Sequence, residues 1–84
     1  MADVTIYTAV PCGYCRAAKS YFDGHDVPYT EIDLTGDMPA RMDLLRRTSS
    51  RTVPQIFIGD HHVGGYTELR ALAARGELSP LLQR

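Results

Sequence analysis

The chain has 84 residues, which is enough for one domain (residues 1–84) but leaves no room for a second hydrophobic core. Its 44% hydrophobic and 23% charged residues are typical of a soluble globular protein. The net charge of −1 argues against a nucleic-acid-binding surface. No stretch approaches the ~18 apolar residues of a membrane span. The N-terminus has no signal-peptide pattern, so we expect a cytoplasmic protein that binds neither nucleic acid nor membrane.

The first part of the chain alternates strand and helix patterns. Residues 4–8, VTIYT, alternate β-branched and aromatic side chains and predict a short strand. A helix ending near Gly24 should follow, because three residues recur on one of its faces: Cys15, Ala18 and Phe22. Residues 27–34 then predict a second strand.

A second helix and a hairpin follow. Asp37 is a candidate N-cap for a helix that runs to Arg47, with helical spacing of Met38, Met42 and Leu45. Residues 48–52 are polar and predict a loop. Two strands, Gln55–Ile58 and His61–Val63, then flank a Gly-Asp turn, which is typical of a hairpin.

The last helix is predicted to begin after Thr67 as its cap and to stop at Gly76. Arg70 stands three residues after Thr67, so we expect no capping box. The element order is therefore β-α-β-α-β-β-α, with a right-handed parallel crossover first and an antiparallel hairpin later. This order predicts an α/β fold with a small mixed sheet and helices on both faces.

The two cysteines, Cys12 and Cys15, lie where the first strand turns into the first helix. The free N–H groups and the dipole of a helix N-terminus stabilise a thiolate, and can lower a thiol pKa from ~8.5 to about 3.5–7.5. Arg16 and Lys19 add positive charge nearby. Cys12 is therefore the expected nucleophile, and Cys15, about one turn inside the helix, the resolving thiol.

Two plainer interpretations of the cysteine pair are less favourable. An inert disulfide closing so short a loop would constrain the unfolded chain little. A zinc site would need two further ligands. The three histidines, which stand in the predicted hairpin or at a helix end, are poor candidates: His25, His61 and His62.

Three motifs together resemble the glutaredoxin family, most closely its small bacterial dithiol members: CGYC at 12–15, TVP at 52–54 and GGYTE at 64–68. The resemblance spans nearly the whole chain. It implies a thioredoxin-like fold, with a four-stranded mixed sheet flanked by three helices. Thioredoxins carry WCGPC, whereas this chain has no tryptophan and has Tyr14 in the third motif position.

The resemblance also implies a glutathione site. Pro54 stands where the family has a cis proline, and the Val53 backbone would face the cysteinyl part of glutathione as an added strand does. The helix N-terminus after the Gly-Gly pair would bind the γ-glutamyl carboxylate. The implied glutathione-binding residues are Tyr14, Arg46, Thr52, Val53, Pro54, Gly65, Tyr66, Thr67 and Glu68.

The sequence departs from the family pattern near this site. Ala9 replaces a lysine that contacts a glutathione carboxylate, and Arg46, or otherwise Arg51, would supply the missing charge. Thr67 stands where the family often has an acidic residue that contacts the γ-glutamyl amine. Glu68 would partly compensate for that loss.

A third departure is Gly13, where the commonest family motif has proline. Family motifs without that proline are associated with a [2Fe–2S] cluster held between two subunits. In such a complex Cys12 of each subunit and two glutathione thiolates would be the ligands. The apo chain is then expected to be a monomer, and the cluster would bridge a homodimer.

These observations predict a glutathione-dependent thiol–disulfide oxidoreductase. Cys12 would attack glutathionylated or disulfide-bonded proteins, and Cys15 would resolve the mixed disulfide that a protein disulfide leaves on Cys12. The first alternative is a [2Fe–2S]-binding module that uses Cys12. The second is a thioredoxin-like protein reduced by a flavoenzyme, against which the absence of WCGPC argues.

Overall fold

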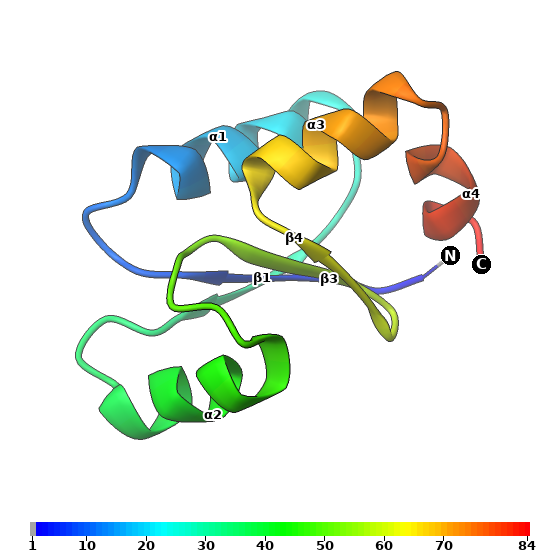
Figure 1. Cartoon of the computed structure of the whole chain (residues 1–84). Helices are drawn as coiled ribbons and strands as arrows, with labels where there is room; N and C mark the ends of the chain where they lie inside the picture. Colours follow the sequence, from blue (N-terminus) through cyan, green and yellow to red (C-terminus); the bar gives the residue numbers. More distant parts are fainter. Residues whose placement is uncertain (1) are drawn as a thin grey trace.

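A computed structural model describes residues 2–84 and contains one mixed sheet flanked by helices (Figure 1). The strands are β1 (Val4–Thr8), β2 (Thr30–Asp33), β3 (Gln55–Ile58) and β4 (His61–Gly64). The helices are α1 (Gly13–Gly24), α2 (Met38–Thr48), α3 (Tyr66–Ala74) and α4 (Leu78–Leu82).

The sheet has the strand order β2-β1-β3-β4. β1 pairs with β2 in parallel and with β3 antiparallel, and β3 pairs with β4 antiparallel. This topology confirms the predicted parallel crossover followed by a hairpin. It also places the end of β1, where the cysteine motif begins, beside the start of β3, where the Val-Pro pair lies.

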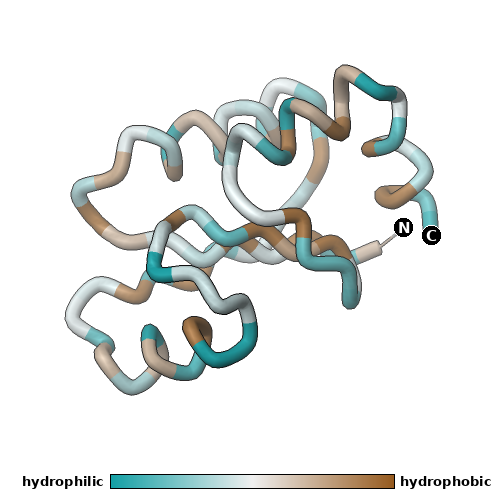
Figure 2. Tube along the Cα trace, in the orientation of Figure 1, coloured by the Kyte–Doolittle hydropathy of each residue, from teal (hydrophilic) through white to brown (hydrophobic). Residues whose placement is uncertain are grey.

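Helices α1 and α3 cover one face of the sheet and α2 lies on the other (Figure 1). The core lies between the sheet and α1, α3 and α4. Figure 2 shows hydrophobic residues along the strands of the sheet. Within residues 2–84, no helix is long and apolar enough to cross a membrane. The buried core residues are Val4, Ile6, Ala18, Phe22, Ile56, Ile58, Val63, Leu69, Leu78 and Leu81.

The predicted start of α2 is confirmed, because the Asp37 side chain accepts a hydrogen bond of 3.1 Å from the Ala40 N–H. The spacing of Met38, Met42 and Leu45 predicted the helix but does not identify its buried face. Leu44 is the buried residue of α2, whereas Met38 is 63% exposed and Met42 is 44% exposed. The two methionines of α2 therefore lie at the surface of the protein.

The predicted start of α3 is wrong. Gly65, not Thr67, is the N-cap, and the helix begins at Tyr66. Glu68 is therefore the third helical residue, and its side chain accepts a hydrogen bond of 2.7 Å from the Gly65 N–H. That contact is half of a capping box, a feature that we did not expect. The predicted stop is confirmed, because Gly76 follows the helix with a left-handed φ of 72°.

A fourth, short helix corrects the expected number of three. α4 contains Pro80, and its five residues are too few for a periodic pattern to predict a helix. Its Leu78 and Leu81 lie one turn apart and are both buried in the core. Burial of these two leucines therefore stabilises a helix that local sequence preference does not predict.

Candidate active site

Cys12 and Cys15 form a disulfide at the N-terminus of α1. Cys12 is the N-cap, and its Sγ accepts a hydrogen bond of 3.1 Å from the Cys15 N–H. A sulfur in this position accepts a hydrogen bond from a backbone N–H and lies at the positive end of the helix dipole. These interactions favour the thiolate of Cys12 once the disulfide is reduced.

The two sulfur-bearing residues differ in accessibility. Cys15 is only 3% exposed, whereas Cys12 is half-buried at the surface end of the helix. An external thiol or disulfide can therefore reach Cys12 more easily than Cys15. This asymmetry agrees with a nucleophile at Cys12 and a resolving thiol at Cys15.

The loop before β3 lies against the cysteine pair. The Val53–Pro54 peptide bond is cis, as the family resemblance implies, and the Val53 carbonyl oxygen lies 3.6 Å from the Cys12 Sγ. The buried side chain of Gln55 holds this loop by donating a hydrogen bond of 2.9 Å to the Thr52 carbonyl. The Val10–Pro11 bond before Cys12 is also cis, which we did not anticipate.

A cleft of about 160 Å³ lies beside this loop and collects most of the residues predicted to bind glutathione. Tyr14 is 66% exposed at its edge, and its ring centroid is 6.3 Å from that of Tyr66. Eight of the nine predicted residues line the cleft: Tyr14, Thr52, Val53, Pro54, Gly65, Tyr66, Thr67 and Glu68.

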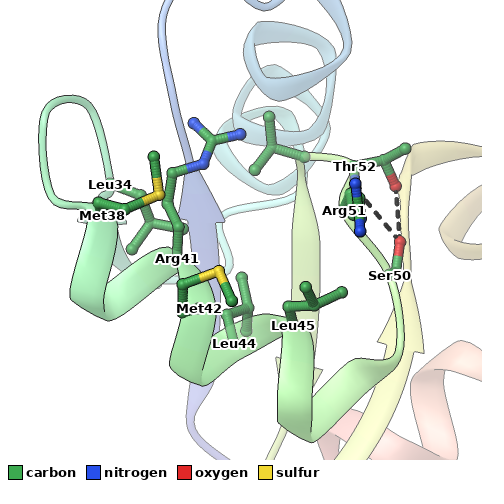
Figure 3. Close-up of a pocket in the computed structure, with 10 residues that line it drawn as sticks. Leu34, Met38, Arg41, Met42, Leu44, Leu45, Ser50, Arg51 and Thr52 are labelled. Atoms are coloured by element: carbon green, nitrogen blue, oxygen red, sulfur yellow. Dashed lines mark hydrogen bonds between the residues drawn. The ribbon is translucent and has the colours of Figure 1, made fainter.

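Arg46 is the predicted residue that the structure does not bring to the cleft. Its side chain is 69% exposed and lies 3.8 Å from the Asp43 carboxylate on α2. Arg41, which our sequence analysis missed, instead lines a groove together with Arg51 and Val53. Figure 3 shows the Arg41 side chain extending away from α2, with Met38 beside it. Helical periodicity distinguishes these arginines only once the orientation of α2 on the sheet is known.

A polar cluster lines the hollow on the other side of the cysteines. Thr8 donates a hydrogen bond of 2.7 Å to Glu31 Oε2, and Lys19 Nζ lies 3.0 Å from the same oxygen. These three residues and both cysteines line a hollow of about 420 Å³. The hydrogen bond from Thr8, and then that from Lys19, lower the pKa of the Glu31 carboxyl group.

We expect Glu31→Gln to lower the free energy of unfolding by about 0.5–1 kcal/mol near neutral pH, a value kept small because the pair is partly exposed. Because the folded-state pKa lies below the ordinary value of 4.5, this stabilisation is present above that pH and is lost as the pH falls through the folded-state pKa. The difference between variant and parent should therefore shrink in acid. Urea unfolding at about pH 7 and about pH 3 measures it.

The matched control is Asp60→Asn, which removes an exposed carboxylate in the β3–β4 turn. That variant should unfold like the parent at both pH values. An equal loss of stability for Glu31→Gln at both pH values would contradict the assigned charge interaction.

A single chain offers little support for a metal centre. Among residues 2–84, no group of three or more His, Cys, Asp and Glu side chains is placed to hold a metal ion. Of the two cysteine sulfurs only that of Cys12 is accessible, so a [2Fe–2S] cluster would need further ligands from a second chain and from glutathione. An added Cβ at Gly13 would meet nothing within 4 Å, so the glycine there is not required by packing. The cluster stays a prediction.

Comparisons with known proteins agree with this geometry. The family model described as Glutaredoxin matches residues 4–63. The chain belongs to the glutaredoxin family. It is 43% identical over 83 residues to Glutaredoxin 3 of Escherichia coli strain K12, covering 99% of this chain and 100% of that protein. It is 44% identical to a glutaredoxin of Pseudomonas aeruginosa, covering 98% of both chains.

Solved glutaredoxin structures share the fold. A crystal structure of a buckwheat glutaredoxin–glutathione complex superposes with a TM-score of 0.89 at 31% identity, over 98% of this chain and 77% of that one. The solution structure of a glutaredoxin from Brucella melitensis superposes with a TM-score of 0.86 at 41% identity, over 98% of this chain and 89% of that one. With its Cys12–Cys15 disulfide at the start of α1, this glutaredoxin is a thiol–disulfide oxidoreductase.

Proposed function

We propose that this glutaredoxin is a glutathione-dependent oxidoreductase of the cytoplasm that reduces protein–glutathione mixed disulfides and protein disulfides. The observation that carries the proposal is the cleft at Val53, which opens beside the reactive sulfur and is lined by eight residues from three separate segments. The buckwheat relative, whose structure is a glutathione complex, supports the choice of ligand.

Different groups of the cleft are complementary to the cysteinyl backbone, the γ-glutamyl carboxylate and the γ-glutamyl amine of glutathione. The Val53 backbone, close to Cys12, would pair with the cysteinyl residue as an added strand does. The first N–H groups of α3, at Tyr66 and Thr67, would receive the γ-glutamyl carboxylate. Glu68 uses one carboxylate oxygen to cap Gly65, and its other oxygen would accept from the γ-glutamyl amine.

The glycine carboxylate of glutathione needs a cation at the opposite end. Arg41 is half-buried and lines the same groove as Val53, whereas Arg46 is turned to solvent and lies beside Asp43. We therefore assign this contact to Arg41 in place of Arg46. Arg51, which is exposed in the loop before Val53, adds to the positive charge.

The reaction proceeds by two thiol–disulfide exchanges. The Cys12 thiolate attacks the glutathione sulfur of a protein–glutathione disulfide, and the protein sulfur leaves as a thiolate that is protonated by water. A second glutathione thiolate then attacks the glutathione sulfur on Cys12, which releases the Cys12 thiolate and forms glutathione disulfide. With a protein disulfide, the Cys12 thiolate attacks one sulfur and the other leaves as a thiolate. The Cys15 thiolate then attacks the Cys12 sulfur, which releases the second target thiolate and forms the Cys12–Cys15 disulfide. Two glutathione molecules reduce this disulfide to the dithiol and become glutathione disulfide.

The choice of reductant tests the proposal. With a glutathionylated peptide as substrate, we expect turnover with glutathione, glutathione reductase and NADPH, and little turnover with thioredoxin reductase and NADPH. Arg41→Ala should raise the KM for glutathione about tenfold, the loss expected when a charged contact is removed, whereas Arg46→Ala should leave it unchanged. Equal or faster turnover with thioredoxin reductase would favour the thioredoxin-like alternative.

A further inference from the structure

A groove of about 280 Å³ lies between α2 and the loop before β3 (Figure 3). It shares Thr52 and Val53 with the cleft proposed to bind glutathione. Its apolar lining consists of Leu34, Met38, Met42, Leu44, Leu45 and Val53. Met38 and Met42 are 63% and 44% exposed, so their side chains are not needed to complete the core. A hydrophobic surface of this kind on a small protein indicates a binding face.

The rim of the groove is positively charged. Arg41 and Arg51 line it, and neither forms an ion pair within the described part of the chain. Residues 38–52 contain four arginines and one aspartate, although the whole chain has a net charge of −1. An occupant that combines apolar side chains with negative charge would therefore match this surface.

The groove is also continuous with the reacting sulfur. Val53 lines it, and the carbonyl oxygen of Val53 lies 3.6 Å from Cys12 Sγ. A polypeptide joined to Cys12 through a disulfide can thus extend from that sulfur along α2. Glutathione has two carboxylates but no bulky apolar side chain, so it does not account for the exposed methionines.

We propose that this groove docks the polypeptide of a target protein beside the cysteine that Cys12 attacks, and that it selects a bulky apolar residue next to an acidic one. The inference rests on the proposed function and specifies its protein substrates. The methionine side chains, which are flexible and polarizable, adapt to apolar residues of different shape. Arg41 and Arg51 bind the acidic residue and orient the segment while a protein disulfide is attacked, a step in which no glutathione occupies Arg41.

Two synthetic peptides with one intramolecular disulfide each test the proposal. The first carries Leu and Asp beside the attacked cysteine, and the second carries Ser and Lys at those positions. The double variant Met38→Gln/Met42→Gln should raise the KM for the Leu-Asp peptide about fivefold or more, because the groove loses apolar contact area. The KM for the Ser-Lys peptide and for a cysteine–glutathione disulfide should not change.

Ile32→Gln is the matched control, because it replaces an apolar residue on β2 that is 37% exposed and lies outside the groove. This variant should reduce both peptides as the parent does. An equal rise in KM for both peptides in the double variant would overturn the proposal. So would a dimer in gel filtration that the double variant dissociates, since the groove would then be occupied by a second copy of the chain.

The same assay with dithiothreitol as reductant separates this inference from the proposed function. If glutathione fails to support turnover but dithiothreitol reveals the preference for the Leu-Asp peptide, the groove is a docking site and the glutathione dependence is wrong. If glutathione supports turnover and the parent shows no preference between the peptides, the docking proposal fails alone.

Discussion

Cys12→Ser is expected to lower disulfide reduction by at least about a thousandfold with every substrate, because a serine hydroxyl remains protonated where a cysteine forms the attacking thiolate. The Cys12 Sγ accepts a hydrogen bond of 3.1 Å from the Cys15 N–H and caps α1, a position that favours the thiolate of Cys12. Reduction of a cysteine–glutathione disulfide and of a disulfide peptide, measured with NADPH consumption, tests this expectation.

A serine at this position is itself a good N-cap, so the variant should fold as the parent does. The thermal unfolding of the variant should be compared with that of the parent in its reduced form, because the variant cannot form the disulfide. Substantial activity in a folded Cys12→Ser protein would show that Cys15 is the attacking thiol and would reverse the assigned roles.

Cys15→Ser is expected to separate the two reactions. Reduction of a protein disulfide should fall at least about a hundredfold, because nothing resolves the mixed disulfide on Cys12. Deglutathionylation should stay within about threefold of the parent, since a second glutathione replaces Cys15 in that reaction. The hydrogen bond to Cys12 comes from the backbone N–H of residue 15, which the substitution leaves in place.

Mass spectrometry of the Cys15→Ser protein after incubation with glutathione disulfide provides an independent measurement. A single glutathione should be found on Cys12. A variant that loses deglutathionylation together with protein disulfide reduction would contradict the division of roles between the half-buried Cys12 and the buried Cys15.

Much of the fold could be predicted because the relevant signals are local. Strand alternation in residues 4–8, the cap at Asp37 and the stop at Gly76 each depend on a few neighbouring residues, and each is observed. The start of α3 was predicted two residues late, because Thr67 is a favourable cap while Gly65 has no side chain to indicate one. The sequence signal for a start at Tyr66 is Glu68, which stands three residues after Gly65, the position that a capping box requires.

The positions of Arg41 and Arg46 could not be predicted from local sequence patterns. A helical pattern tells which residues share a face of α2, but it does not tell that Arg41 lines the groove beside Val53 while Arg46 is turned to solvent. The same limit applies to the methionines of α2, whose spacing predicted the helix but not which of its side chains are buried.

The sequence by itself determined the chemistry: two thiols in one motif, at the junction of a strand and a helix whose N-terminus stabilises a thiolate. It also determined the order of the elements from β1 to α3, since each of these depends on nearby residues, whereas α4 depends on the burial of Leu78 and Leu81. Only the tertiary structure decided what surrounds the reactive sulfur. Val53 lies 41 positions from Cys12 and reaches it because β3 pairs with β1. Such a contact depends on how distant segments pack, which no local pattern encodes.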